Sequence, residues 1–115
     1  MIVDAHSHIF PRVQGLIGEG PTHGPGYGRV EVAGRVSQAL PPYNAKTEFT
    51  PQMLVANMDW AGVDRVILLQ GSFYGECDDY VARAISDFPD RLSGAMYADP
   101  WRVDYRQVFE DRFDR

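Results

Sequence analysis

The second half of the chain alternates between patterns typical of buried strands and patterns typical of amphipathic helices. Four consecutive apolar residues at 66–69 indicate a strand that is buried on both faces, as in a parallel sheet. Apolar residues recur at helical spacing in 51–61 before it and in 78–88 after it. A further strand is predicted at 92–98, followed by a helix from Asp104. Strict alternation of this kind predicts an α/β fold of parallel strands joined by right-handed helical crossovers.

Local signals mark the ends of these helices. Thr50 is a favourable N-cap residue, Pro51 suits the first helical position, and Gly62 fits the C-terminal stop. Pro89 ends the second helix, because proline cannot continue one. The boundaries therefore predict short helices, each placed between two strands.

The N-terminal half departs from this regularity. A short strand is predicted at 2–8, and residues 11–28 hold nine glycines and prolines, a density typical of a loop. Alternating apolar and polar residues at 29–36 predict a small hairpin. We therefore expect residues 11–49 to form an inserted loop-and-hairpin region between the first strand and the first helix.

Composition and charge exclude several classes of protein. The 115 residues include 11 basic and 16 acidic side chains, a net charge of −5, which argues against binding nucleic acid by neutralising phosphates. The sequence has no run of about 18 apolar residues, so we expect no membrane-spanning helix. The single cysteine, Cys77, rules out an internal disulfide, and its acidic neighbours are expected to raise the pKa of an unreactive thiol. These features favour a cytoplasmic location.

The motif that carries chemistry is Asp4-Ala5-His6-Ser7-His8. Side chains alternate faces along a strand, so Asp4, His6 and His8 are expected to share one face, with Asp4 orienting a ligand. Two imidazoles at this spacing can reach one divalent ion. The spacing alone does not exclude that the two histidines have no role in metal binding. Their position at the carboxyl end of the first strand of an α/β pattern favours the metal site.

The sequence DAHSHIFP at residues 4–11 resembles the first-strand signature of the amidohydrolase superfamily. It looks most like the branch called amidohydrolase family 2, which includes metal-dependent hydrolases and aminocarboxymuconate-semialdehyde-decarboxylase-like enzymes. Residues 53–70 are similar to the first helix and second strand of that branch, and residues 89–100 are similar to the region of its third strand. The resemblance covers most of 1–9 and 50–105.

That family folds as a (β/α)8 barrel with a metal centre above the C-terminal ends of the strands. The resemblance implies that residues 1–115 are the N-terminal part of one such TIM-barrel domain, about three βα units with a Gly/Pro-rich insertion after the first strand. It carries His6 and His8 over as metal ligands, with zinc as the expected ion and manganese as the alternative. The family's later histidines and last-strand aspartate have no counterpart here. The remaining histidine, His23, is expected to be a solvated loop residue.

The resemblance implies a metal-dependent hydrolase in which a metal-activated water attacks a small carboxylate, amide or lactone substrate. The same family contains metal-dependent decarboxylases, and the residues do not separate the two reactions. Because most of the family's catalytic residues are absent, the chain is expected to be catalytically incomplete by itself. A third alternative is a non-catalytic fragment or interaction module, whose open sheet edges pair with a second copy or with a chain that completes the barrel.

Residues that follow the second and third strands are candidates for substrate binding. Gln70 ends the second predicted strand, Phe73 and Tyr74 lie in the turn after it, and Asp99 ends the third strand. In a barrel they would lie at the catalytic face and contact a small-molecule substrate. The alternatives are turn chemistry with a packed aromatic ring and, for Asp99, a cap on the turn before Pro100.

Overall fold

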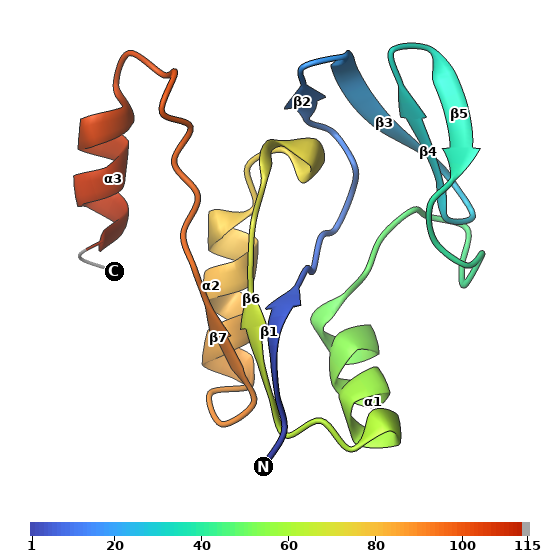
Figure 1. Ribbon diagram of the computed structural model, residues 1–115, viewed down its shortest axis with the longest axis vertical. Coiled ribbons are helices and arrows are strands. Elements are labelled where there is room, and N and C mark those ends of the chain that lie inside the picture. Colours follow the sequence, from blue (N-terminus) through green and yellow to red (C-terminus); the bar gives the residue numbers. More distant parts are fainter. Residues whose placement is uncertain (114–115) are drawn as a thin grey trace.

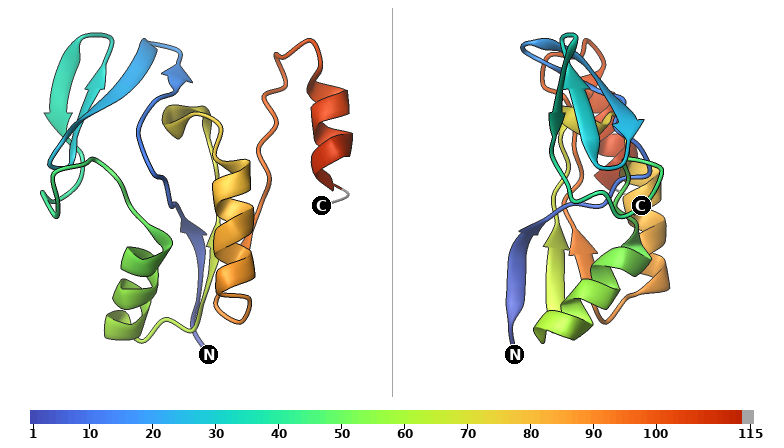
Figure 2. Two further views of the ribbon diagram at one scale, coloured as in Figure 1. Left: turned by 180° about the vertical axis from the view of Figure 1, so that it is seen from behind. Right: turned by 90° about the vertical axis from the view of Figure 1, so that its right-hand side faces the viewer.

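The computed structural model describes residues 1–113 and contains a parallel and an antiparallel sheet (Figure 1). In chain order, the elements are β1 (Val3–Ser7), β2 (Leu16–Ile17), β3 (Gly20–Gly26), β4 (Arg29–Val32), β5 (Arg35–Gln38), α1 (Pro51–Ala61), β6 (Arg65–Leu68), the 3-10 turn η1 (Ser72–Tyr74), α2 (Asp78–Asp87), β7 (Leu92–Gly94) and α3 (Tyr105–Phe113). The molecule is flat, with extents of 40 × 38 × 19 Å, as the right-hand view of Figure 2 shows.

The parallel sheet has the strand order β1-β6-β7, with β6 in the middle. The connection from β1 to β6 contains α1, and the connection from β6 to β7 contains α2. Parallel strands joined through helices confirm the prediction of an α/β fold. That this sheet is part of a barrel stays a prediction.

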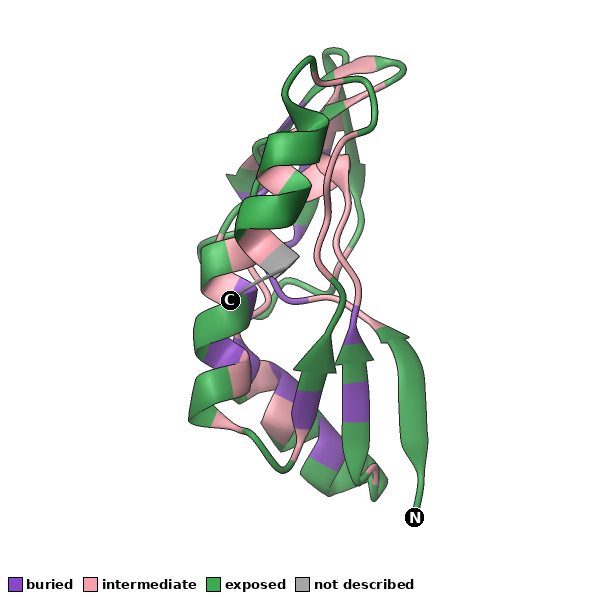
Figure 3. Ribbon diagram, turned by 90° about the vertical axis from the view of Figure 1, so that its left-hand side faces the viewer, coloured by how far each residue is buried: buried purple, intermediate pink, exposed green. Residues whose placement is uncertain are grey.

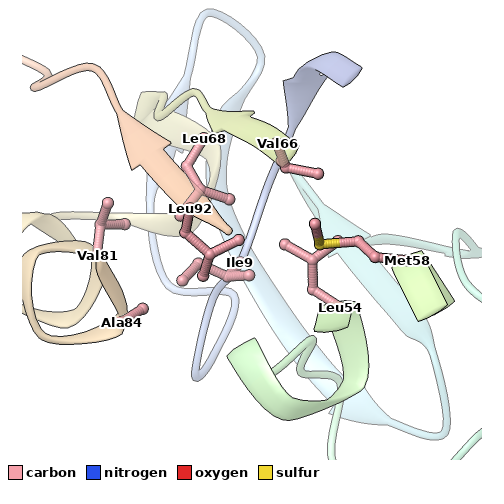
Figure 4. Close-up of a cluster of buried hydrophobic side chains, with 8 residues drawn as sticks. All are labelled: Ile9, Leu54, Met58, Val66, Leu68, Val81, Ala84 and Leu92. Atoms are coloured by element: carbon pink, nitrogen blue, oxygen red, sulfur yellow. The ribbon is translucent and has the colours of Figure 1, made fainter. Parts of the chain in front are cut away.

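Helices cover one face of the parallel sheet. Val66 and Leu68 of β6 are 1% and 0% exposed. They belong to a buried cluster drawn in Figure 4, which consists of Ile9, Leu54, Met58, Val66, Leu68, Val81, Ala84 and Leu92. The alternate residues of β6, Arg65 and Ile67, are exposed, as the alternating colours of the sheet in Figure 3 show. The predicted burial of this strand on both faces is therefore wrong, because no described element covers its second face.

Helix α1 begins and ends where the sequence predicts. Thr50 Oγ1 accepts a hydrogen bond from the backbone N–H of Met53 at 3.2 Å, and Pro51 occupies the first helical position. Gly62 follows the helix with a left-handed φ of 71°, and its backbone N–H donates to Met58. Both predicted boundaries are confirmed.

The inserted region contains more regular structure than predicted. The hairpin expected at 29–36 is formed by β4 and β5, which pair across a turn with positive φ at Ala33 and Gly34. The loop expected at 11–28 is wrong in part, because it contains β2 and β3, and these extend the hairpin into a sheet of order β2-β3-β4-β5. Gly26 is the last residue of β3 and has a φ of 104°, next to an irregularity in the pairing of β3 with β4. A glycine, which in sequence indicates a loop, therefore lies here in an irregular strand.

Backbone contacts anchor the insertion to the rest of the chain. Phe10 and Phe49 exchange two backbone hydrogen bonds of 2.9 Å. Gly15 approaches η1 so closely that a Cβ at this position would lie 1.7 Å from a carbonyl oxygen of that turn. Thr22 Oγ1 accepts a hydrogen bond from the Gly15 N–H at 2.8 Å and donates one to the Phe73 carbonyl at 2.7 Å. The insertion is therefore seated directly on the turn that follows β6.

The C-terminal part keeps the predicted order of elements. β7 spans three residues, fewer than the predicted strand at 92–98. The helix expected from Asp104 is α3, and its Arg112 contacts Glu76 and Asp78 at the start of α2. Ion pairs of Arg112 therefore link α3 to the residues around the start of α2.

The predicted barrel unit of residues 1–115 extends beyond the described part by two positions, 114 and 115. Among the described helices, none has the length and apolarity needed to cross a membrane. The longest of them, α1, has 11 residues and spans about 16 Å, against a hydrocarbon thickness of about 30 Å.

The one-sided burial of β6 predicts unequal effects of truncating neighbouring side chains. Leu68→Ala removes a fully buried side chain and should lower the free energy of unfolding by about 2–5 kcal/mol. Ile67→Ala, on the open face, should lower it by about 1 kcal/mol or less. Urea denaturation followed by circular dichroism measures both, and equal losses would contradict an open second face.

Candidate functional site

Two histidine side chains converge at the carboxyl end of β1. The Nε2 atoms of His6 and His8 lie 3.1 Å apart, and the ring centroids are 5.0 Å apart at an interplanar angle of 74°. His6 lies within β1, and His8 directly follows its last residue. The structure thus brings together the two imidazoles that the sequence predicts as metal ligands.

The third polar residue of the motif does not join this pair. Asp4 pairs with Val66 of β6. Ser7 pairs with Leu68, so the register slips by one residue between the two positions and the alternation of faces is interrupted. The Asp4 carboxylate accepts a hydrogen bond from the backbone N–H of His6 at 2.9 Å. The described residues do not place Asp4 with the two histidines as a third ligand, and the prediction that it orients a ligand stays a prediction.

A backbone carbonyl orients His8. Its Nδ1 lies 2.9 Å from the carbonyl oxygen of Leu69, the residue after β6. A carbonyl oxygen only accepts, so Nδ1 carries the proton, and in the neutral ring Nε2 then keeps its lone pair. In the contact between the two rings, His8 Nε2 is then the acceptor and His6 Nε2 the donor. A hydrogen bond on the second ring nitrogen is also the usual support of a metal-ligating histidine.

The separation of the two nitrogens fits ligation of one ion. Two nitrogens bound at about 2.0–2.1 Å to a tetrahedral zinc ion lie about 3.3–3.4 Å apart. The 3.1 Å between His6 and His8 differs from this by a few tenths of an ångström, which a small rotation of one ring supplies. Within residues 1–113, no group of three or more His, Cys, Asp or Glu side chains is placed to hold a metal ion. The described residues therefore offer a pair of ligands.

Aromatic rings line one side of the histidine pair. Tyr74 in η1 has its ring centroid 5.5 Å from that of His8. It stacks on Phe10 at 4.2 Å and meets Phe73 edge-on at 5.2 Å. Burial raises the pKa of the Tyr74 hydroxyl, and Cys77 adds to the rise. Tyr74, whose ring lies beside His8, therefore stays neutral over the physiological pH range.

A mostly apolar cavity of about 320 Å³ opens beside these rings. It is lined by Phe10, Val13, Val30, Ala39, Leu40, Phe73 and Tyr74. The structure thus places the predicted substrate-binding residues Phe73 and Tyr74 on one cavity near His8. Sequence reasoning misses Val30 and Leu40, which the insertion contributes. No local signal identifies them, since their proximity to η1 depends on how the insertion is seated.

The other two predicted substrate-binding residues make local contacts. Gln70 Nε2 donates a hydrogen bond to the carbonyl of Ala95 at 3.0 Å, which ties the end of β6 to the end of β7. Asp99 Oδ1 accepts from the backbone N–H of Trp101 at 2.9 Å, which is the turn cap considered as its alternative. The structure does not bring either side chain into contact with the histidines, and their substrate role stays a prediction.

Cys77 is a packed thiol. It is buried in a second cluster with Phe10, Val13 and Val30. Burial is the main cause that raises the pKa of the thiol, Arg12 partly offsets it, and Asp78 adds to the rise. The pKa of the thiol is raised, as its acidic neighbours predict, although burial contributes more to the rise than their charge.

Comparison with known proteins gives a likeness in structure alone. No family model matches the chain, and no curated protein matches it. A similar solved structure is a probable 2-pyrone-4,6-dicarboxylic acid hydrolase from Acinetobacter baumannii with citric acid bound, at a TM-score of 0.50 and 21% sequence identity. The match covers 96% of this chain and 34% of that chain. This likeness is one of fold. The chain spans about a third of the length of its structural neighbour.

The hydrogen bond from His8 to Leu69 predicts different tautomers for the two imidazoles. With chelator present and at a pH where both rings are neutral, His8 should be protonated on Nδ1 and His6 on Nε2. Long-range ¹H–¹⁵N correlation spectra distinguish the two tautomers. An Nε2-protonated His8 would contradict the assigned geometry.

Proposed function

We propose that this chain forms the first βα units of a TIM-barrel, metal-dependent hydrolase of the amidohydrolase type. The 3.1 Å approach of two Nε2 atoms at the carboxyl end of the first parallel strand carries this proposal. In parallel α/β structures, catalytic groups gather at that end of the strands. Zinc is the ion proposed for His6 and His8, with manganese as the alternative, and the remaining ligands would come from further protein or from water.

The residues of this chain hold and shield the proposed centre. The Leu69 carbonyl fixes the tautomer in which His8 can act as a ligand, and the ring of Tyr74 would lie on one side of a bound ion. A bound divalent ion would lower the pKa of a coordinated water molecule and would polarise a substrate oxygen. The apolar cavity beside Tyr74 would receive the less polar part of a small substrate.

The structural neighbour supports hydrolysis over decarboxylation. It is described as a probable 2-pyrone-4,6-dicarboxylic acid hydrolase, and hydrolases of that substrate belong to the amidohydrolase superfamily. The substrate class proposed here is accordingly a small carboxylate-bearing ester, lactone or amide. The proposed cellular location is the cytoplasm.

Metal titration tests the ligand assignment without requiring turnover. The chain should bind Zn²⁺ weakly, and the His6→Ala/His8→Ala double variant should bind it at least about tenfold less tightly, since both donors are removed. Competition with a chromophoric chelator measures the affinity, and circular dichroism confirms that the variant is folded.

His23→Ala is the matched control, because it removes an exposed imidazole from β3 and leaves the pair intact. It should retain the wild-type affinity for Zn²⁺. Equal affinity of wild type and the His6→Ala/His8→Ala variant would refute the metal site, as would a larger loss in the control than in that variant.

A second candidate function is association through the open side of the parallel sheet. β1 is one of the two edge strands of this sheet. Val3 of β1 pairs with Arg65, so these residues and Ile67 line the face that no described element covers. Val3 and Ile67 are 46% and 37% exposed. Exposed apolar residues on an unprotected edge favour pairing with another strand, and the proposed occupant is a second copy of this chain.

Charge placed on the open face should prevent this association. Wild type should scatter light with a mass above the 13.0 kDa of one chain, and Val3→Lys/Ile67→Lys should shift it toward one chain. Trp60→Lys is the control, since Trp60 is highly exposed on α1, away from the sheet edge. A monomeric wild type at all concentrations would exclude this second function.

A further inference from the structure

A second pocket, of about 390 Å³, lies on the insertion and carries positive charge. Its walls come from three segments: the residues before β2, strand β3, and the segment before α1. Each wall contributes one basic or imidazole side chain, namely Arg12, His23 and Lys46. No aspartate or glutamate lines the pocket. This is unexpected for a chain with a net charge of −5 and a single lysine.

The floor of the pocket is held by specific contacts. Thr47 is 4% exposed, and its hydroxyl accepts a hydrogen bond from the Gly26 N–H at 3.1 Å and donates one to the carbonyl of Arg29 at 2.8 Å. A Cβ at Gly24 would lie 3.0 Å from Thr47 Cβ and 3.4 Å from that of Val13. The three segments are therefore packed against one another, and a ligand would not need to assemble them.

The two cations are free to meet a ligand. Among the described residues, the ion pairs do not use Arg12 or Lys46. Arg12 also lines a neighbouring pocket together with Glu76, Asp78 and Asp79. His23 is paired with Glu31 in the register of β3 and β4. Two unpaired cations and an imidazole therefore face one pocket.

We propose that this pocket binds a small organic anion with several carboxylates. A volume of about 390 Å³ is within the range of small-molecule sites and is oversized for one inorganic ion. Arg12 offers a planar fork suited to one carboxylate, Lys46 offers a point charge for another, and His23 offers a ring N–H. This site is separate from the proposed metal centre and does not depend on it.

Isothermal titration with propane-1,2,3-tricarboxylate, in low salt and with chelator present, tests the proposal. Wild type should bind it, and Arg12→Ala and Lys46→Ala should each weaken binding about fivefold or more. Binding should also weaken as sodium chloride is raised, because salt screens the attraction between ligand and pocket. Circular dichroism should show that both variants keep the wild-type fold.

Arg35→Ala is the matched control, because Arg35 is an exposed cation on β5 outside the pocket. It should bind the tricarboxylate as wild type does, and so should the His6→Ala/His8→Ala variant. Wild type that does not bind, inorganic phosphate that binds as tightly as the tricarboxylate, or an equal loss in Arg35→Ala would overturn the proposal. Loss in the histidine variant alone would place the ligand at the metal centre and would also overturn it.

Discussion

The packing of β6 against α1 and α2 is the interaction on which the rest of this structure depends. Val66 and Leu68 place the middle strand on the helix layer, and β6 forms backbone hydrogen bonds with both β1 and β7. The strand leads directly into the carbonyl of Leu69, which orients His8, and into η1, which carries Tyr74. The position of one buried strand therefore fixes both the carbonyl that orients His8 and the ring of Tyr74 beside it.

Features that depend on neighbouring residues are predictable from this sequence. The cap residues Thr50 and Gly62 act within one helical turn, so their types alone locate α1. The convergence of His6 and His8 follows from their spacing at the end of a strand. Each of these predictions needs no knowledge of the remaining chain.

Features that depend on distant contacts escape the sequence. The slip in register after Asp4 arises in the pairing of β1 with β6, and simple alternation along the strand does not predict it. Strand β3 is rich in glycine and proline, yet pairing with β4 makes it a strand. The open face of β6 looks identical in sequence to a buried one, because apolar residues at 66–69 do not record whether a second layer exists.

The insertion joins two chemically different surfaces. Toward η1 it presents Val30 and Leu40 to the apolar cavity beside Tyr74. Elsewhere it presents Arg12 and Lys46 to the cationic pocket. Figure 1 shows this antiparallel sheet beyond the carboxyl ends of β1 and β6, the end of the molecule where the histidines lie. A region that the composition marks as a loop is thus the part of the chain with the most varied potential contacts.

The close approach of Gly15 to η1 limits how the two parts of the molecule can diverge. Any side chain at this position would collide with the backbone of the turn and displace it. Such a displacement would carry Tyr74 away from His8, although residue 15 touches neither ring. Substitution within the insertion is therefore constrained by the position of Tyr74, because the contact at Gly15 has to remain free of a side chain.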